Sequence, residues 1–254
     1  MTAPDTHRQA VAVVTGGSGG IGSAICTKLA AAGLRVVVGY NRSVEAARQL
    51  VQSLPGDGHS ARPAPVTDSA ALTALAASIA KEYGGCDALV NCAGVTRFVR
   101  HADLDSLDDE LINTILATNV RGAFAAVRAF RPLLENSTLA GGGVVVNLSS
   151  AAGNIAMGSN VIYCASKAAL DNMTKSLARA LAPRIRVVSV SPALVDTEFV
   201  KSLDQAWRDE QAARTPLGRL ATPAEVGTAV TAVINTLTFT TGTILAVDGG
   251  RTLG

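Results

Sequence analysis

The sequence is poor in charged and aromatic residues. Of its 254 residues, 17% are charged and 4% are aromatic, and the formal net charge is only +2. So small a charge argues against a nucleic-acid or anionic-membrane partner held by bulk electrostatics. The longer apolar runs, such as Val36–Val38 and Val144–Val146, are far too short to span a bilayer. The composition therefore favours neither a nucleic-acid-binding protein nor a membrane protein.

Cysteine is also scarce. Cys26, Cys86, Cys92 and Cys164 form no CxxC pair and no metal-like cluster with the three histidines. The first nine residues, Met1–Gln9, are polar and lack the apolar core of a secretory signal. We therefore expect four reduced thiols, no bound metal and a cytoplasmic protein.

Apolar residues make up 48% of the chain, which is enough for a large core. Short β-branched runs alternate with longer alanine-rich stretches of helical pattern, which predicts βαβ units and a parallel sheet. The expected strands are Ala10–Thr15, Arg35–Gly39, Arg62–Val66, Ala88–Asn91, Val144–Ser149, Arg186–Ser191 and Ile244–Val247. The expected helices begin near Gly20, Ser43, Asp68, Leu107, Asn160 and Pro223, with an irregular helical piece over Glu198–Ala212. We expect one domain over residues 1–254, with a tail at 1–9.

Two prolines in the third expected strand indicate the strand order. Pro63 and Pro65 lack N–H groups on the same side of the strand, which a sheet tolerates only at an edge. The third strand is an edge in the doubly wound order 3-2-1-4-5-6. The alternative is that Arg62–Val66 is only a loop.

A glycine-rich stretch, Thr15–Gly22, lies between the first expected strand and the first helix. Glycines let the backbone turn sharply and lie close to a ligand, and a helix that follows aims its free N–H groups at a phosphate. Gly17, Gly19 and Gly22 can be read as GxGxxG, which is a weak signal in a chain this rich in glycine. The context predicts a nucleotide site, most simply for a dinucleotide.

The end of the second expected strand favours a particular dinucleotide. No acidic residue occurs in Gly33–Val44, where NAD-binding chains carry one for the ribose 2′-hydroxyl. Tyr40 is followed by Asn41, Arg42 and Ser43, and a guanidinium there would pair with a 2′-phosphate. We predict NADP(H), with NAD(H) possible. The alternative is that Arg42 is a solvated residue at a helix start.

A second group of residues predicts acid–base chemistry. Tyr163 and Lys167 are four residues apart in a helical pattern and therefore share one face. A neighbouring ammonium would lower the tyrosine pKa and make it an acid or base for a substrate oxygen. Ser150 closes the fifth strand, where parallel sheets bind ligands. Taken alone, the pair could also be an ordinary exposed helix pair. No motif places a histidine beside Ser150, so a Ser-His-Asp hydrolase gains little support.

Six segments in order resemble the classical short-chain dehydrogenases/reductases, from Val11 to Gly250. The matching segments are Thr15–Gly22 for TGxxxGxG, Asn91–Gly94 for NNAG, Asn119, Ser150–Lys167 for the serine, tyrosine and lysine, Ser191–Thr197 for PGxxxT, and Thr241–Gly250. The resemblance implies an α/β doubly wound Rossmann fold, a seven-stranded parallel sheet flanked by helices on both faces. It also implies hydride transfer between NADP(H) and the carbonyl or alcohol carbon of a small ketone or secondary alcohol.

The resemblance assigns roles to four residues. Tyr163 would exchange the proton of the substrate oxygen, and Lys167 would lower the tyrosine pKa and bind the nicotinamide ribose. Ser150 would orient the carbonyl, and Asn119 would hold a water that links Lys167 to solvent. The implied cofactor-binding residues are Gly16, Ser18, Gly20, Ile21, Gly22, Tyr40, Asn41, Arg42, Ser43, Val66, Asn91, Ala93, Gly94, Tyr163, Lys167, Pro192, Val195 and Thr197.

Four positions depart from the family pattern. Pro65 stands where many members have a polar residue near the adenine, which leaves that contact to the backbone of Val66. Cys92 replaces the second asparagine of NNAG, and Ala193 replaces the glycine of PG. Gly19 stands where many NADP-using members carry Arg or Lys, which leaves the 2′-phosphate to Arg42.

The substrate and partners are less closely defined. A variable stretch at about 196–216, which carries Trp207, would form a substrate lid. An alternative activity is 3-oxoacyl-acyl-carrier-protein reduction, for which Arg184 is a suitable docking cation but Gly141–Gly143 offers none. An alternative of another class is a catalytically silent NADP(H)-binding redox sensor, against which the complete tetrad argues. The resemblance also implies a homotetramer, formed through the helices around Asn119 and Tyr163.

Overall fold

Seven parallel strands form one sheet in the computed structural model, which describes residues 8–253 apart from the Phe199 side chain. The strands are β1 (Val11–Thr15), β2 (Arg35–Tyr40), β3 (Ser60–Pro63), β4 (Ala88–Asn91), β5 (Gly143–Leu148), β6 (Ile185–Pro192) and β7 (Ile244–Val247). Their order is β3-β2-β1-β4-β5-β6-β7, so the predicted doubly wound arrangement is confirmed.

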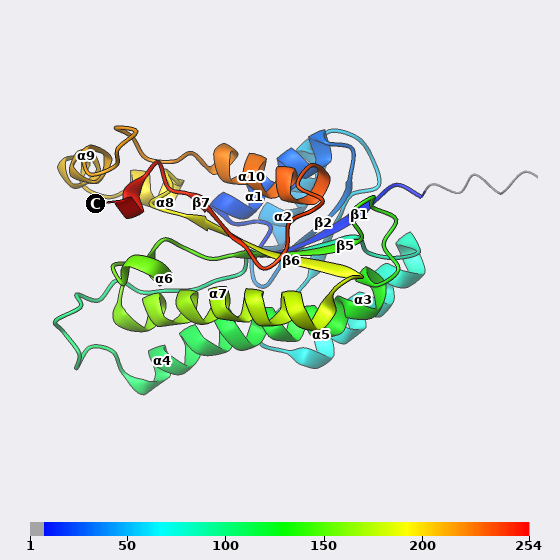
Figure 1. Cartoon of the computed structure of the whole chain (residues 1–254), viewed down its shortest axis with the longest axis horizontal. Helices are drawn as coiled ribbons and strands as arrows, with labels where there is room; N and C mark the ends of the chain where they lie inside the picture. Colours follow the sequence, from blue (N-terminus) through cyan, green and yellow to red (C-terminus); the bar gives the residue numbers. More distant parts are fainter. Residues whose placement is uncertain (1–7, 254) are drawn as a thin grey trace, which may run out of the picture.

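Helices cover both faces of the sheet (Figure 1). The helices are α1 (Gly20–Ala31), α2 (Val44–Ser53), α3 (Ser69–Tyr83), α4 (Asp109–Leu116), α5 (Ala123–Leu134), α6 (Ala152–Ile155), α7 (Val161–Leu181), α8 (Glu198–Lys201), α9 (Gln205–Ala213) and α10 (Pro223–Asn235). A π-helical turn, Ala117–Gly122, joins α4 to α5, and a short 3₁₀ turn covers Arg251–Leu253. In Figure 1, α1, α2 and α10 lie on one face, and α3, α4, α5 and α7 lie on the other.

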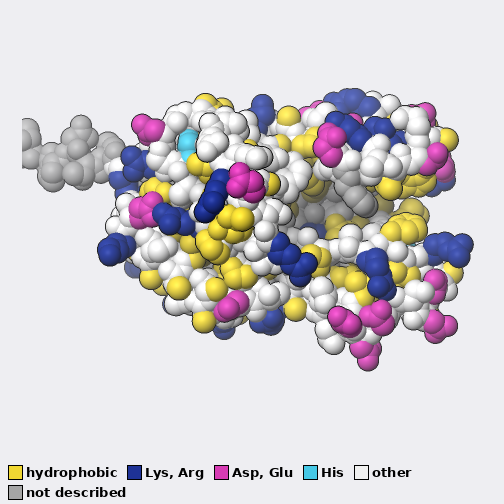
Figure 2. Space-filling view, turned by 180° about the vertical axis from the view of Figure 1, so that it is seen from behind, with side chains coloured by type: hydrophobic (Ala, Val, Ile, Leu, Met, Phe, Trp, Pro, Cys, Tyr) yellow, Lys and Arg dark blue, Asp and Glu magenta, His cyan; other side chains and the backbone are white. Residues whose placement is uncertain are grey.

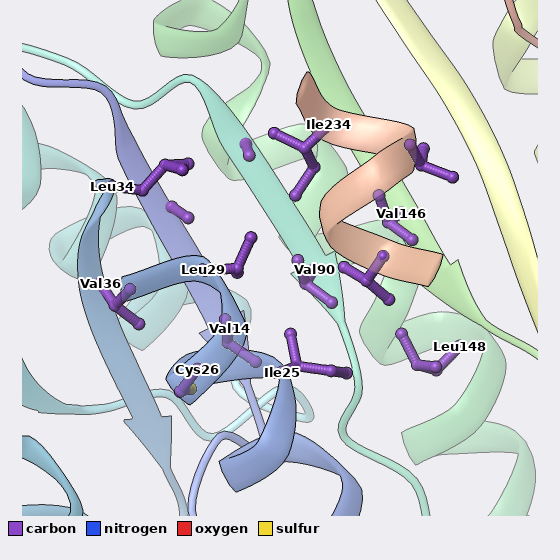
Figure 3. Close-up of a cluster of buried hydrophobic side chains, with 14 of the residues drawn as sticks. Val14, Ile25, Cys26, Leu29, Leu34, Val36, Val90, Val146, Leu148 and Ile234 are labelled. Carbon is purple, nitrogen blue, oxygen red and sulfur yellow. The ribbon is translucent and has the colours of Figure 1, made fainter. Parts of the chain in front are cut away.

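Side chains of each strand alternate between two cores. Val14 and Val36 lie in the core under α1 and α10, which Figure 3 shows, whereas Val13 and Val37 lie in the core under α3 and α5. Strands that are buried on both faces must be apolar at successive positions, which explains their continuous valine runs.

The third strand begins two residues earlier and ends three residues earlier than predicted. It spans Ser60–Pro63 and pairs with β2, so Pro65 lies outside it. Its position at the sheet edge is as the prolines indicated. The apolar pattern missed Ser60 because an edge strand that is only half buried needs no apolar run; here the Tyr83 hydroxyl donates to Ser60 Oγ instead.

Most helices begin where the sequence predicted, but the α4–α5 region differs from the prediction in two ways. The helix expected near Leu107 begins at Asp109, because Asp108 caps it by accepting from Leu111 N. The same segment is then widened by the π turn at 117–122. Such turns are rare and occur frequently at functional sites.

The predicted tail, residues 1–9, is described only in part, because residues 1–7 lie outside the described chain. The last two residues of that tail make specific contacts. Arg8 donates two hydrogen bonds to the buried carboxylate of Asp87, at 2.6 and 3.1 Å, and Gln9 Nε2 donates to Gly33 O.

Candidate active site

The glycine-rich loop between β1 and α1 is packed too closely for side chains. Gly16 has φ +65°, and a Cβ placed there would lie 2.8 Å from Ala93 Cα. A Cβ on Gly22 would lie 2.2 Å from Gly16 O. Gly19 caps α1 without any side-chain hydrogen bond to the helix, which leaves the first N–H groups of α1 without a side-chain acceptor. The loop therefore fits the phosphates of a dinucleotide, which need close backbone approach and N–H donors.

Thr15 holds this loop against the segment after β4. Its Oγ1 accepts hydrogen bonds from Cys92 N and Ala93 N, both at 3.2 Å, and donates to Val90 O at 3.3 Å. The sequence predicted no separate role for Thr15. Its place at the end of an apolar strand was the available signal.

The groups proposed for the 2′-phosphate lie exposed at the end of β2. Asn41, Arg42 and Ser43 are all exposed, and Ser43 begins α2 without capping it through its hydroxyl. Among residues 8–253, no side chain pairs with the Arg42 guanidinium or bonds to it. A cation, a hydroxyl and a helix start are thus available together for an anion.

Asn119 lies in the π turn and is only 2% exposed. Its Oδ1 accepts from Val95 N at 2.8 Å, and its Nδ2 donates to Val95 O and to Ser166 Oγ, each at 3.1 Å. A Cβ on Gly94 would lie 3.5 Å from Asn119 Oδ1 and 3.8 Å from Lys167 Nζ. Gly94 therefore lies between two of the candidate catalytic residues.

Tyr163 and Lys167 lie on one face of α7, as their spacing predicted. Asn160 caps this helix by accepting from Tyr163 N at 2.7 Å. Lys167 Nζ lies 5.6 Å from the centre of the Tyr163 ring and donates to Leu148 O at 2.6 Å. Burial lowers the pKa of Lys167 to about 8, so the ammonium is still the main form at neutral pH.

The pKa of Tyr163 is raised, whereas the sequence predicted that it would be lowered. Burial raises it, while a hydrogen bond with Ser150 acts in the lowering direction. Cys164 also acts in the raising direction. The hydroxyl therefore stays protonated at neutral pH. Ser150 itself follows β5, and its Oγ accepts from Ala152 N at 3.2 Å.

The Asn91 side chain lies in a polar row inside the sheet. The sheet register places Thr15, Asn91, Asn147 and Ser189 in one buried polar row across four strands. Asn91 Nδ2 donates to Asn147 Oδ1 at 2.9 Å and to Ala123 O at 3.4 Å. Its side chain thus joins β4 to β5 and α5.

The segment after β6 returns to the glycine-rich loop. Val195 is buried and pairs with Ala221 in an isolated parallel bridge. A Cβ on Gly20 would meet Thr197 at 3.3 Å, so Thr197 lies over the first turn of α1. Pro192 ends β6, one of the strand ends that face this crevice. Val66, by contrast, packs against Gly122 of the π turn: a Cβ there would lie 2.8 Å from Val66 Cγ2.

The predicted lid region contains two short helices, α8 and α9. Arg208 of α9 forms an ion pair with Asp196 at 2.9 Å, which ties the helix to the segment after β6. Trp207 is 37% exposed. Figure 2 shows a hollow at the end of the molecule that carries α6, α8 and α9 in Figure 1, with basic and acidic side chains interspersed over the surface around it.

Residues 8–253 lack two further kinds of feature. Residues 8–253 hold no cluster of three or more His, Cys, Asp or Glu side chains suited to a metal ion. None of their helices is both long and apolar enough to cross a membrane. The four cysteines are free, and three of them are buried.

A close-packed glycine loop and a half-buried tyrosine beside a buried lysine at the carboxyl ends of parallel strands define a nicotinamide-dependent oxidoreductase. A family model described as "Enoyl-(Acyl carrier protein) reductase" matches residues 16–252. The chain is 39% identical over 253 residues to "Granaticin polyketide synthase putative ketoacyl reductase 2" of Streptomyces violaceoruber, covering 99% of each chain. It is 37% identical to "Cis-4-hydroxycyclohexanecarboxylate dehydrogenase" of Sinomonas cyclohexanicum, covering 98% of each.

A solved structure agrees with this assignment. A short-chain dehydrogenase/reductase from Brucella melitensis, titled a glucose/ribitol dehydrogenase, superposes with a TM-score of 0.87 at 28% identity. The match covers 95% of this chain and 96% of that one. The protein belongs to the classical short-chain dehydrogenase/reductase family, whose members use NAD(P)(H).

Proposed function

We propose that this protein reduces the carbonyl group of a small ketone, or oxidises the matching secondary alcohol, with NADP(H). The observation that carries the proposal is the gathering of Ser150, Tyr163 and Lys167 where β5 and α7 meet the glycine-rich loop. The chemistry that the dinucleotide supplies when bound is hydride transfer at nicotinamide C4.

The chain's own residues would manage the proton. For reduction, Tyr163 would donate its hydroxyl proton to the carbonyl oxygen as that oxygen becomes an alcohol. Burial keeps this hydroxyl protonated at neutral pH, which is the form that reduction needs. Ser150 would hold the same oxygen through its hydroxyl, and the Lys167 ammonium would favour the tyrosinate left behind.

The first test is a panel of simple ketones with NADPH and NADH, run on the wild type and on Tyr163→Phe. We expect turnover by the wild type and a loss of at least a hundredfold in kcat for the variant, because general acid catalysis is worth about that much. NADPH binding, followed by fluorescence titration, should be kept. Full activity in Tyr163→Phe would remove the mechanism, and NADPH binding without turnover on the whole panel would favour a silent redox sensor.

The preference for NADP(H) is supported by the unpaired Arg42 beside Ser43 at the start of α2. Gly19 works against it, since it offers no second cation. Arg42→Ala should raise the Kd for NADPH about tenfold and leave that for NADH unchanged, because a charge-assisted contact to the 2′-phosphate is lost. Arg48→Ala, an exposed arginine farther along α2, is the matched control and should change neither. Equal use of NADH and no effect of Arg42→Ala would contradict the preference.

A second candidate is reduction of 3-oxoacyl groups on acyl carrier protein. Two relatives favour it: the ketoacyl reductase named above and the 3-oxoacyl-(acyl-carrier-protein) reductase of Vibrio cholerae, 33% identical over 242 residues. Arg184 is exposed and available for docking, but the turn at Gly141–Gly143 adds no cation. Comparing an acetoacetyl thioester with simple ketones by kcat/KM separates the two candidates.

The remaining sequence expectations belong to the same proposal. They are one domain with a lid at about 196–216, a cytoplasmic location and a homotetramer. A monomer by sedimentation would refute the homotetramer.

A further inference from the structure

Ser166 lies between the two catalytic segments and is fully buried. Its Oγ donates to the Tyr163 main-chain carbonyl at 2.7 Å and accepts from Asn119 Nδ2 at 3.1 Å. A serine inside a helix often bonds back to its own helix in this way. The second bond is different, because it reaches from α7 to the π turn.

The donor in each of these bonds is fixed. The Ser166 hydroxyl has one proton, which the Tyr163 carbonyl receives, so its oxygen is left to accept from Asn119. Asn119 then uses its whole amide, with Oδ1 and Nδ2 both bonded to Val95. One hydroxyl therefore sets the orientation of an amide that holds the segment after β4.

The consequence reaches the catalytic lysine. Gly94 precedes Val95 and lies between Asn119 Oδ1 and Lys167 Nζ. If the amide of Asn119 rotates, the hydrogen bond to Val95 N is lost. The Gly94–Val95 segment, which forms the wall beside Lys167, then moves. Tyr163 is coupled to the same wall, since its carbonyl receives the other Ser166 bond.

We infer that Ser166 is a positioning residue for the proposed hydride-transfer reaction, holding Asn119 and the Gly94–Val95 wall in register with Tyr163 and Lys167. It touches none of the reacting atoms itself. This inference rests on the proposed function for its kinetic consequence, but its structural consequence at Val95 stands alone.

The test compares Ser166→Ala with the wild type. Alanine fits the site without added volume, so the fold should persist. With NADPH and a ketone that the wild type reduces, kcat should fall about tenfold, the worth of roughly one hydrogen bond, with KM values for both within twofold. Hydrogen–deuterium exchange at Val95 N should quicken at the same time, because Asn119 Oδ1 no longer stays aimed at it.

Two variants control for the loss of a hydroxyl. Thr174→Val removes another fully buried hydroxyl from α7, and Ser78→Ala removes a serine that bonds back to its helix in α3. Both should keep kcat and Val95 exchange at wild-type values. Unchanged kcat in Ser166→Ala, or equal losses in Thr174→Val, would overturn the inference.

The two proposals fail differently. If the wild type reduces no ketone, the proposed function fails, and Val95 exchange alone decides whether Ser166 positions Asn119: faster exchange supports it and unchanged exchange overturns it. If the wild type is active and Ser166→Ala matches it, only the positioning role is lost.

Discussion

The buried ammonium of Lys167 should lower the free energy of unfolding of this protein. Its side chain is buried, and burial lowers its pKa from 10.5 to about 8. Each pKa unit corresponds to about 1.4 kcal/mol, so keeping the ammonium charged at pH 7 costs about 3 kcal/mol of folding free energy. Replacing it with methionine removes that cost but also loses the hydrogen bond to Leu148 O, worth about 1 kcal/mol. We expect Lys167→Met to be more stable than the wild type by about 2 kcal/mol and inactive.

The pH dependence identifies the cause. The unfolded chain binds a proton at Lys167 more tightly than the folded chain does, so stability rises with pH. The penalty is fully present below about pH 8 and disappears as pH rises through 10.5. Between pH 7 and 9.5 the wild type should recover about 2 kcal/mol through this one group. Lys167→Met should not show that gain.

Urea unfolding at pH 7 and 9.5, on protein without added dinucleotide, measures both differences. Lys175→Met is the matched control, because Lys175 is exposed on the same helix and its replacement should change stability by less than about 0.5 kcal/mol at either pH. A Lys167→Met protein that is less stable than the wild type at pH 7, or a difference that does not shrink by pH 9.5, would refute the reasoning.

Two further predictions concern the loop and the start of the chain. Gly22→Ala should weaken NADPH binding at least tenfold in a fluorescence titration, because its Cβ would lie 2.2 Å from Gly16 O and the loop must move. Binding equal to that of the wild type would contradict this. Asp87→Asn should cost about 2–3 kcal/mol in urea unfolding at pH 7, since Arg8 loses its buried partner. Burial raises the pKa of Asp87, but Arg8 and several other donors together hold it below its usual value, so its contribution is present above about pH 4 and is lost as pH falls. A difference that does not begin to shrink as pH falls below about 4 would count against the ion pair.

The sheet could be predicted from the sequence because each strand is marked by residues within or next to it. Valine runs on both sides of glycine turns, and prolines at the edge, each follow from what a buried or an edge strand tolerates. The π turn around Asn119 could not be predicted in that way. Nothing in Ala117–Gly122 breaks a helical pattern, and the turn is held by contacts with Val66 and Val95, which lie far away along the chain.

In the candidate site too, features set by nearby residues could be predicted, and features set by distant contacts could not. Tyr163 and Lys167 are four residues apart, so a helix alone brings them together. The directions of their pKa shifts were beyond prediction, since both depend chiefly on burial, which only the folded chain shows. Ser166 was overlooked because a serine before a lysine is unremarkable until its partner Asn119, 47 residues away, is placed beside it.

These observations together explain why the site is tuned for a bound dinucleotide. Lys167 is buried with one carbonyl partner, and the first N–H groups of α1 lack a side-chain acceptor. Arg42 is exposed and has no partner within the described part of the chain. Each of these costs stability or leaves a donor unused in the protein alone. All three are cations or N–H donors, and a dinucleotide carries phosphate oxygens and ribose hydroxyls that can accept from them. These donors are already ordered in the folded protein, so the dinucleotide would gain their hydrogen bonds without a further ordering cost. That is the property expected of a preorganised site.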